Sequence, residues 1–159
     1  MLVMRTDKSF IIRNKENGMQ IKSILNSIEK QQGFVYDSAR WCMHAGQRAI
    51  EIAIHPRKGS RPACSGCGKR CPGYDTLPTR RFEFVPLWNI KVFFVHAPRR
   101  CNCPRCGIKV ERLPWAKGKS HLTASYAWFL AGWAKKLTWT DTAKAFHASW
   151  DTVVRAVRM

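Results

Sequence analysis

The sequence has no hydrophobic run long enough to cross a membrane. Its longest nearly apolar stretch, residues 126–134, contains nine residues, whereas a membrane-spanning helix takes roughly 20. At the N-terminus, Arg5, Asp7 and Lys8 interrupt the short apolar pieces, so the hydrophobic core of a signal peptide is missing as well. These absences predict a cytoplasmic protein without a membrane partner.

Acidic residues are scarce too. The 159 residues include 10 Asp and Glu against 28 Lys and Arg, which gives a formal net charge of +18. Such an excess favours a polyanionic partner, and nucleic acid is the simplest one, because basic surfaces release counterions from phosphates with little dependence on sequence. The excess is largest in residues 61–121, which contain 13 basic and 3 acidic residues. The middle of the chain is therefore the expected electrostatic centre.

The seven cysteines do not indicate a disulfide framework, because their number is odd and the cytoplasm keeps thiols reduced. Metal ligation is the natural use for most of them. Four cysteines form two C-x-x-C-G units that 35 residues separate: Cys64 and Cys67, then Cys103 and Cys106. Two intervening residues let one tight turn present both thiols, and zinc prefers four such ligands in a tetrahedron. We therefore predict one structural Zn²⁺ ion with a closed ligand shell.

The remaining cysteines and two of the histidines are placed outside this site. Cys71 and Cys101 offer alternative ligands, but neither has the C-x-x-C spacing, and both are interpreted as spectators. Cys42 is distant in the sequence and is interpreted as a packed or exposed thiol. His96 and His121 are predicted to be surface residues.

The hydrophobic patterns divide the chain into four parts. Residues 1–18 show no sustained period and are interpreted as an unstructured or spurious extension. Residues 19–60 contain a helix and a small β element. Residues 61–121 contain both cysteine pairs and form the predicted zinc-ribbon domain. Residues 122–159 form the predicted, truncated helix-turn-helix.

Short periodicities predict the individual elements. Apolar residues at helical spacing indicate a helix over 21–28, and the segment 34–55 has the alternation of a β element. Residues 81–85 and 91–96 have the pattern of a hairpin, with Pro86 at an edge or a bulge because proline cannot donate to a ladder. A third region, beginning at Leu122, contains one apolar helical stripe, and further helices are expected from the N-cap Thr140 and after Ser149. The expected fold class is α+β, a small zinc ribbon whose β-hairpin joins two C-x-x-C knuckles, followed by a three-helix helix-turn-helix.

Several longer motifs make the chain similar to a known family. They are Cys-Ser-Gly-Cys-Gly at 64–68, Cys-Pro-Gly-Tyr-Asp at 71–75, Arg-Arg-Phe-Glu-Phe-Val-Pro-Leu-Trp at 80–88, Cys-Pro-Arg-Cys-Gly at 103–107, Val-Glu-Arg-Leu-Pro-Trp-Ala at 110–116 and Trp-Ala-Lys-Lys-Leu-Thr-Trp at 133–139. With these motifs the chain resembles the N-terminal region of ISL3-type transposases of bacterial insertion sequences. The resemblance implies a zinc-binding domain and a helix-turn-helix that precede a catalytic RNase H-like domain.

The resemblance implies a catalytic domain that the sequence does not contain. Strand transfer by two metal ions needs converging carboxylates, and the ten acidic residues of this chain are scattered. We therefore expect a truncated, DNA-binding front end that is catalytically inactive alone. Its expected partner is double-stranded DNA at the terminal inverted repeats of the element, with a full-length transposase or a second copy of the chain as further partners. The expected location is the bacterial cytoplasm, at the nucleoid.

Two groups of residues are predicted to contact DNA. On the helix after Ser149, Thr152, Arg155 and Arg158 face outward, where a recognition helix meets the major groove. Around the second cysteine pair lies a group suited to the phosphate backbone, namely Arg99, Arg100, Arg105, Lys109 and Arg112. Three tryptophans of the C-terminal region are interpreted as core packing, namely Trp128, Trp133 and Trp139.

A second class of function stays open. The chain also has the features of a stand-alone zinc-ribbon transcription regulator or of an RNA-binding protein without a tie to mobile elements. Inverted repeats in the neighbouring DNA, and a downstream frame that encodes the acidic domain, would favour the transposase.

Overall fold

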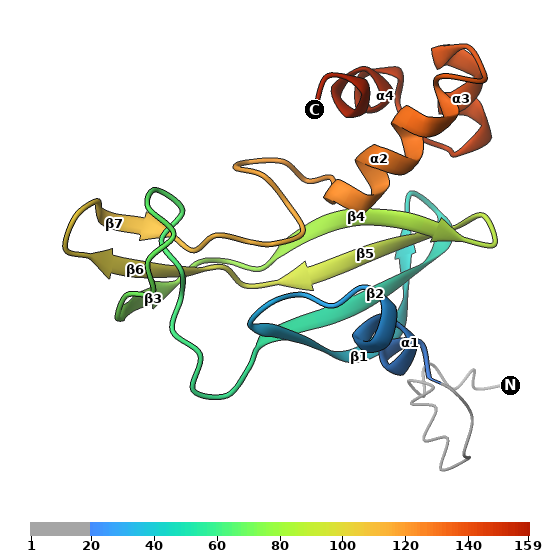
Figure 1. The fold of residues 1–159 in the computed structure, drawn as a ribbon. Helices are drawn as coiled ribbons and strands as arrows, with labels where there is room; N and C mark the ends of the chain where they lie inside the picture. The colour runs from blue at the N-terminus through green and yellow to red at the C-terminus, as the bar shows by residue number, and fades with distance from the viewer. Residues whose placement is uncertain (1–19) are drawn as a thin grey trace, which may run out of the picture.

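The computed structural model describes residues 20–159 (Figure 1). The predicted extension over residues 1–18 lies outside the described residues. Within residues 20–159 the chain forms two β-sheets, with seven strands in all, and four short helices. The division at residues 60/61 and 121/122 stays a prediction, and the larger sheet takes strands from both sides of the first boundary.

The larger sheet has four strands in the order β1-β2-β5-β4. Their bounds are Phe34–His44 for β1, Gln47–Pro56 for β2, Ile90–His96 for β5 and Arg80–Leu87 for β4. The strands β2 and β5 run parallel, whereas the outer pairs are antiparallel. The pair β4 and β5 is the predicted hairpin. Its register shifts between Phe84 and Leu87, so Pro86 lies at an irregularity, as predicted.

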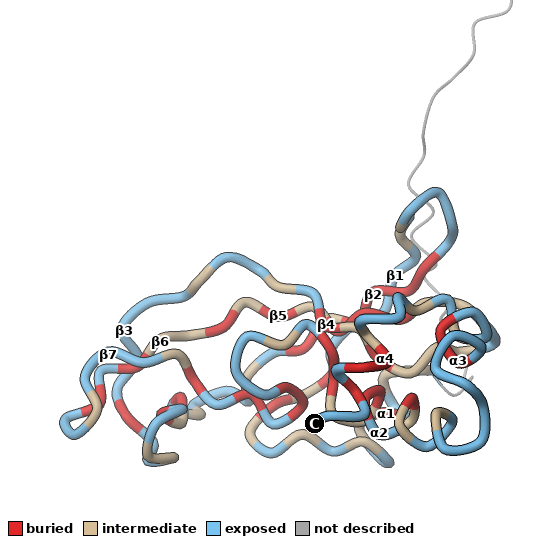
Figure 2. Tube along the Cα trace, turned by 90° about the horizontal axis from the view of Figure 1, so that it is seen from above, coloured by how far each residue is buried: buried red, intermediate tan, exposed pale blue. Residues whose placement is uncertain are grey.

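One face of this sheet forms the main core. Because side chains alternate along a strand, Ile52, Phe94 and Phe82 of three adjacent strands share that face, and all three are fully buried. Helix α1 (Ile21–Ile28) and Trp115, which follows the smaller sheet, pack against them. Figure 2 shows the buried stretches along β2, β4 and β5. Side chains of this size each contribute about 1.5–3 kcal/mol when buried, so this apolar layer stabilises the sheet.

The smaller sheet lies at one end of the larger one (Figure 1). Its strands are antiparallel in the order β3-β6-β7, with bounds Gly73–Thr76, Arg99–Cys103 and Gly107–Val110. The second cysteine pair frames the turn between β6 and β7. The first pair lies in a loop that backbone bridges connect to its surroundings, Ala63 with Arg70 and Cys64 with Glu111. The two knuckles therefore meet on one small sheet.

Three helices follow the smaller sheet, and each begins after a hydroxyl that accepts a hydrogen bond from a first-turn amide. Their N-caps are Thr123 for α2 (Ala124–Trp133), Thr138 for α3 (Trp139–Ala145) and Ser149 for α4 (Trp150–Val157). The helix α4 begins as predicted, whereas α3 begins two residues before the expected start. No helix within the described part is long and apolar enough to cross a membrane.

The helices α2 and α4 pack together and reach the larger sheet. Leu130 of α2 and Ala156 of α4 share one buried cluster, and Val85 of β4 packs against it. Just before α2, Leu122 forms a bridge with Glu83 at the edge of β4. The C-terminal helices are therefore continuous with the larger sheet.

The predicted fold class, a zinc ribbon followed by a three-helix helix-turn-helix, is wrong. The hairpin of β4 and β5 was expected inside the ribbon, but β5 pairs with β2 and completes a four-stranded sheet. The cysteine pairs belong to a separate three-stranded sheet. The described residues are mostly β-sheet, with short helices of seven to ten residues.

Candidate metal centre and its basic surroundings

The four cysteines of the two C-x-x-C-G units lie together. The Sγ atoms of Cys64, Cys67, Cys103 and Cys106 are all within 4.8 Å of one another, and those of Cys67 and Cys103 are 3.6 Å apart. A tetrahedral ion with bonds of about 2.3 Å to sulfur separates its ligands by about 3.8 Å. The four thiols could therefore bind one metal ion.

Each unit folds as a tight turn that its glycines permit. The glycine after each pair has a positive φ, 75° at Gly68 and 72° at Gly107, as expected from the C-x-x-C-G pattern. Gly66 has a different role, which the sequence analysis missed. A Cβ atom at Gly66 would lie 3.1 Å from Cys106 Sγ and 3.6 Å from Cys64 Sγ. A side chain at this position would therefore fit only if the Cys106 sulfur moved by a few tenths of an ångström.

Backbone amides prepare two of the thiols for metal binding. Hydrogen bonds from the amides of Cys67 and Gly66 lower the pKa of the Cys64 thiol. The corresponding amides of Arg105 and Cys106 lower the pKa of Cys103 to about 6. The first cysteine of each pair is thus favoured as a thiolate, which is the form that binds metal.

The second cysteine of the second pair, Cys106, behaves differently. A hydrogen bond with the Cys67 thiol, together with burial, raises the pKa of Cys106 to about 12. A bound cation reverses this effect, because a coordinating thiol is deprotonated by the metal itself. Four thiolates around one divalent ion would then form a closed shell.

Two further cysteines touch this centre. Cys71 and Cys101 are buried in the same cluster as the four thiols, although they are not in the group that could hold the ion. Burial raises the pKa of Cys71 to about 11, and it raises the pKa of Cys101 as well. Both are therefore neutral thiols at neutral pH and pack behind the site. Cys42 is half-buried on β1.

A buried polar network joins the smaller sheet to the larger sheet. Glu111 accepts hydrogen bonds from the Arg99 guanidinium at 2.7 and 2.9 Å, and from the Arg99 amide at 2.9 Å. His96, at the end of β5, lies 3.0 Å from the same carboxylate through Nε2 and 2.9 Å from the carbonyl oxygen of Ile54 through Nδ1. The prediction that His96 is a surface residue is wrong, because it is 3% exposed. His121 is exposed, as predicted.

The pKa of Glu111 follows from this network. Burial alone would raise it, but the hydrogen bonds from His96 and Arg99 outweigh burial and hold the pKa below its ordinary value. The Glu111 carboxylate stays charged and bonds both His96 of the larger sheet and Arg99 of the smaller sheet. The signal for this network was weak in the sequence, because its members lie on different strands.

Comparison with known proteins gives a distant relationship. Over 137 residues the chain is 23% identical to the transposase for insertion sequence element IS1557 of Mycobacterium tuberculosis, in strains CDC 1551 and H37Rv alike. The chain is similar to part of a transposase. The alignment covers 86% of this chain and 29% of the relative, so the chain spans less than a third of the length of the curated relatives it matches. Neither a family model nor a solved structure matches the chain.

The transposase likeness makes the basic residues around the metal centre relevant. Two of the predicted DNA contacts are engaged within the chain: Arg99 pairs with Glu111, and Arg100 pairs with Asp75 and covers the Tyr74 ring. Three others are exposed and have no carboxylate within 4 Å in the described residues, namely Arg105, Lys109 and Arg112. Contact of any of the five with DNA stays a prediction.

The sequence analysis missed three basic residues beside the first knuckle. Arg61, Lys69 and Arg70 are exposed, and none has a carboxylate partner among the described residues. Their signal was sequence proximity, since Lys69 and Arg70 lie between Cys67 and Cys71. Exposed basic side chains without a carboxylate partner therefore lie beside both knuckles. These six residues are called the basic surface: Arg61, Lys69, Arg70, Arg105, Lys109 and Arg112.

The predicted contacts on α4 lie at the other end of the described chain. Arg155 and Arg158 are exposed, as expected, and the Arg155 Nε donates to the carbonyl oxygen of Asp151 at 3.2 Å. Thr152 is half-buried, with its hydroxyl 2.8 Å from the Ser149 hydroxyl at the N-cap. Their contact with DNA also stays a prediction.

The interpretation of the C-terminal tryptophans as core packing is wrong. Trp128 is 79% exposed, and Trp133 and Trp139 are also on the surface. Helical spacing did not distinguish Trp128 and Trp133 from the buried positions of α2, because that helix is apolar on nearly all sides. The smaller residues Ala127 and Leu130 fill the interior instead.

Proposed function

We propose that this chain is the DNA-binding portion of an ISL3-type transposase, and that one Zn²⁺ ion fixes its basic surface. The observation that carries the proposal is the set of unpaired basic side chains on the two knuckles, in a chain similar to part of a transposase. Zinc would be held by Cys64, Cys67, Cys103 and Cys106. Its role would be to crosslink the two knuckles.

The ligand set supports zinc. Four sulfur donors within 4.8 Å of one another suit this ion, and the missing Cβ at Gly66 leaves room for the sulfurs. The amide hydrogen bonds to Cys64 and Cys103 favour thiolates before any metal arrives. A small three-stranded sheet gains stability from such a crosslink, because metal binding contributes directly to folding.

The distribution of charge supports DNA as the partner. Five basic side chains in the described part have carboxylate partners, namely Arg40, Arg81, Lys91, Arg99 and Arg100. Of the Lys and Arg residues in the described part that have none, six exposed ones lie beside the knuckles: Arg61, Lys69, Arg70, Arg105, Lys109 and Arg112. Like charges held together by a rigid sheet repel one another, and duplex phosphates relieve that repulsion. We infer that these six side chains bind the DNA backbone.

Recognition of the terminal inverted repeats is the more specific part of the proposal. Phosphate contacts position a protein, whereas contacts to base edges read the sequence. Thr152, Arg155 and Arg158 of α4 are the proposed base-reading group. Because this group lies on α4 and the phosphate-binding group lies beside the knuckles, the chain would contact two separate parts of a DNA site.

The proposal assigns DNA binding, and not strand transfer, to this chain. Four acidic residues of the sheets and of the segment directly after β7 serve as ion-pair partners: Glu51 with Arg40 and Arg81, Asp75 with Arg100, Glu83 with Lys91, and Glu111 with Arg99. Paired carboxylates on separate strands are a poor site for two divalent ions. A full-length transposase or a second copy of the chain would supply further contacts.

Fluorescence anisotropy with labelled duplexes tests the proposal. The probes are duplexes from the DNA that flanks the gene, scrambled duplexes of equal composition, and single-stranded RNA of equal length, each over a salt series. Tighter binding to one flanking duplex, with affinity that falls as salt rises, is the expected result. Equal affinity for flanking and scrambled duplexes would remove the recognition of inverted repeats. Preference for RNA would favour the alternative function, and no binding to duplex DNA at low salt would overturn the proposal.

A further inference from the structure

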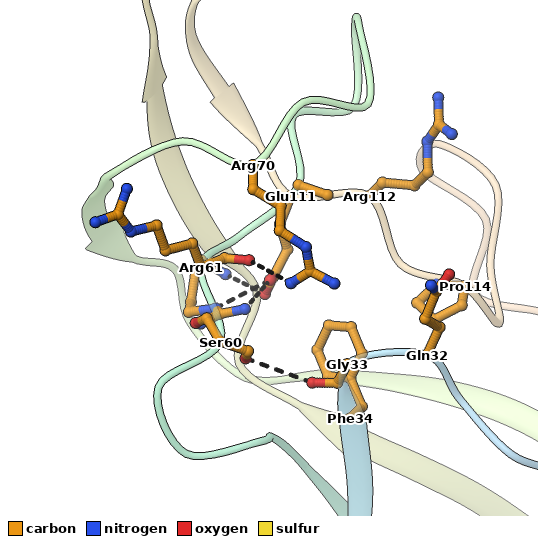
Figure 3. A pocket seen from close by; sticks show the side chains of 11 residues that line it. Gln32, Gly33, Phe34, Ser60, Arg61, Arg70, Glu111, Arg112 and Pro114 are labelled. Atoms are coloured by element: carbon orange, nitrogen blue, oxygen red, sulfur yellow. Dashed lines mark hydrogen bonds and ion pairs between the residues drawn. The ribbon is translucent and has the colours of Figure 1, made fainter.

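A pocket opens where the two sheets meet, next to the first knuckle (Figure 3). Its volume is about 100 Å³, several times the roughly 10–15 Å³ that one water molecule needs. Gly33 and Phe34, at the start of β1, form one side. Four arginines surround the rest, namely Arg61, Arg70, Arg99 and Arg112.

The one carboxylate of the pocket is already neutralised. Glu111 is 3% exposed, and both its oxygens accept hydrogen bonds, from His96 and from Arg99. The third nitrogen of the Arg99 guanidinium donates to the carbonyl oxygen of Ser60 at 2.8 Å. The Glu111–Arg99 pair therefore lines the pocket with groups whose hydrogen bonds are already made within the protein.

Arg70 is the arginine that reaches into the pocket. Figure 3 shows its side chain extending from the knuckle toward Gly33, whereas the guanidinium groups of Arg61 and Arg112 point outward at the rim. One nitrogen of Arg70 donates to the carbonyl oxygen of Arg61 at 3.3 Å. No carboxylate lies within 4 Å of Arg70 among residues 20–159. Its remaining N–H groups can bind an anion from two directions.

The knuckle fixes Arg70 in this position. Ala63 and Arg70 form a backbone bridge, and the Cys64 amide donates to the carbonyl oxygen of Lys69 at 2.8 Å. The Arg112 amide in turn donates to the carbonyl oxygen of Ala63 at 2.7 Å. Arg70 and Arg112 are thus held on the two sides of one short backbone segment. The backbone of Arg70 is therefore already ordered, and its planar guanidinium presents N–H donors in a fixed geometry that suits an oxyanion.

We propose that this pocket binds one phosphate group, with Arg70 as its central ligand and with Arg61 and Arg112 on the neighbouring phosphates. The inference rests on the proposed DNA-binding function in one respect, namely that the phosphate is a backbone phosphodiester of duplex DNA. The same pocket would bind inorganic phosphate more weakly, because a single ion cannot use the rim arginines.

The test compares Arg70→Ala with a matched control. Arg48→Ala removes an equal charge from an exposed arginine of β2 over the Trp41 ring. Arg48 pairs with Met43 near the far end of β1, roughly 30 Å along that strand from Phe34 of the pocket at 3.3 Å per residue. We expect Arg70→Ala to weaken binding to duplex DNA by about tenfold or more. The slope of log affinity against log salt should fall by about 1. Arg48→Ala should change the affinity by less than about twofold.

A conservative variant separates charge from geometry. Arg70→Lys keeps the charge but loses the two-pronged donor, so most of the salt slope should remain while the affinity falls. Equal metal content of all variants would show that the knuckles are intact. If Arg70→Ala and Arg48→Ala weaken DNA binding equally, the pocket is not a phosphate site and the proposal is overturned, although DNA binding itself stands.

Titration with inorganic phosphate tests the pocket in a second experiment that does not depend on DNA. In two-dimensional ¹H–¹⁵N NMR, titration with phosphate should shift the Arg70 side-chain Nε–H signal and leave that of Arg48 in place. If the protein binds no duplex but phosphate shifts Arg70, the proposed function fails while the pocket stands as a free-phosphate site. Absence of any Arg70 shift, together with unchanged DNA affinity in Arg70→Ala, refutes the pocket.

Discussion

Gly66 offers the sharpest test of the proposed zinc site. Replacement by alanine would put a Cβ atom 3.1 Å from Cys106 Sγ, 3.5 Å from Cys106 Cβ and 3.6 Å from Cys64 Sγ. Non-bonded carbon atoms prefer separations of about 3.5–4.0 Å, and sulfur is larger. The Cys106 contact is thus too close by roughly half an ångström.

The size of the effect depends on whether the sulfur can move. In the metal-free protein, Cys106 can rotate away at little cost, because a rotamer change relieves the contact. A coordinated Sγ cannot, since four ligands hold the ion in a tetrahedron. The overpacking penalty of about 1–3 kcal/mol should therefore fall on the metal-bound form. It corresponds to metal binding that is roughly 5- to 150-fold weaker.

The assay is competition for Zn²⁺ with a chromophoric chelator, for Gly66→Ala and for a control. Gly73→Ala is the matched control, because it adds the same methyl group to the same small sheet with nothing within 4 Å. Thermal unfolding without metal should give the same midpoint for both variants. With zinc present, Gly66→Ala should unfold at a lower temperature, because weaker binding adds less stability. Equal zinc affinity of the two variants would refute the reasoning, as would failure of the wild-type protein to bind zinc.

Three further outcomes follow from the same structure. Glu111→Gln should lower the free energy of unfolding by about 3–5 kcal/mol, since it leaves the largely buried Arg99 and His96 without their carboxylate. Urea denaturation measures this free energy. In the control, Asp37→Asn on the exposed β1 surface should lower it by less than about 0.5 kcal/mol. Because the pKa of Glu111 is depressed in the folded protein, its carboxylate should contribute fully to the free energy of unfolding above about pH 4.3, the ordinary glutamate value. This contribution should be lost as the pH falls through the lower pKa of the folded state. If the difference in unfolding free energy between the wild-type protein and Glu111→Gln stayed constant into acid, the result would contradict this expectation. Elemental analysis should find that Cys103→Ser loses the bound metal while Cys42→Ser, which changes a half-buried thiol on β1, keeps it; equal metal content in both would exclude the four-cysteine site.

Local patterns were sufficient to predict individual elements. The helical spacing of apolar residues over 21–28 corresponds to α1, and the alternation on either side of Pro86 corresponds to the hairpin of β4 and β5. The start of α4 followed from Ser149, because a capping hydroxyl is a local signal. These features depend on neighbours within a few residues, which the sequence shows directly.

The grouping of the four cysteines was also predictable. Each C-x-x-C-G unit contains its own turn, and two incomplete ligand pairs have a strong reason to meet. The close packing of Cys71 and Cys101 behind them was not predictable, since burial depends on strands that approach from elsewhere. Gly66 was missed because its conformation is unexceptional, and only its distance to Cys106 Sγ shows why it is glycine.

The assembly of the elements could not be predicted, and the reason is long-range pairing. The β4–β5 hairpin has the same sequence pattern whether it closes a zinc ribbon or adds to another sheet. Its position depends on the parallel register of β5 with β2, for example Ile52 opposite Phe94. Parallel neighbours need a long crossover connection, and here that connection contains the first knuckle and β3. Nothing local in either strand specifies this partner.

This pairing also determines how the proposed DNA-binding surface is held. β5 continues through Pro98 into β6, and the hydrogen bonds among His96, Arg99 and Glu111 lie at this connection between the two sheets. The knuckles are thus connected to the larger sheet by covalent continuity and by a buried carboxylate. The metal would set the mutual arrangement of the two knuckles, whereas Glu111 sets their orientation on the larger sheet. Because Arg70 lies between these two attachments, the pocket depends on both of them.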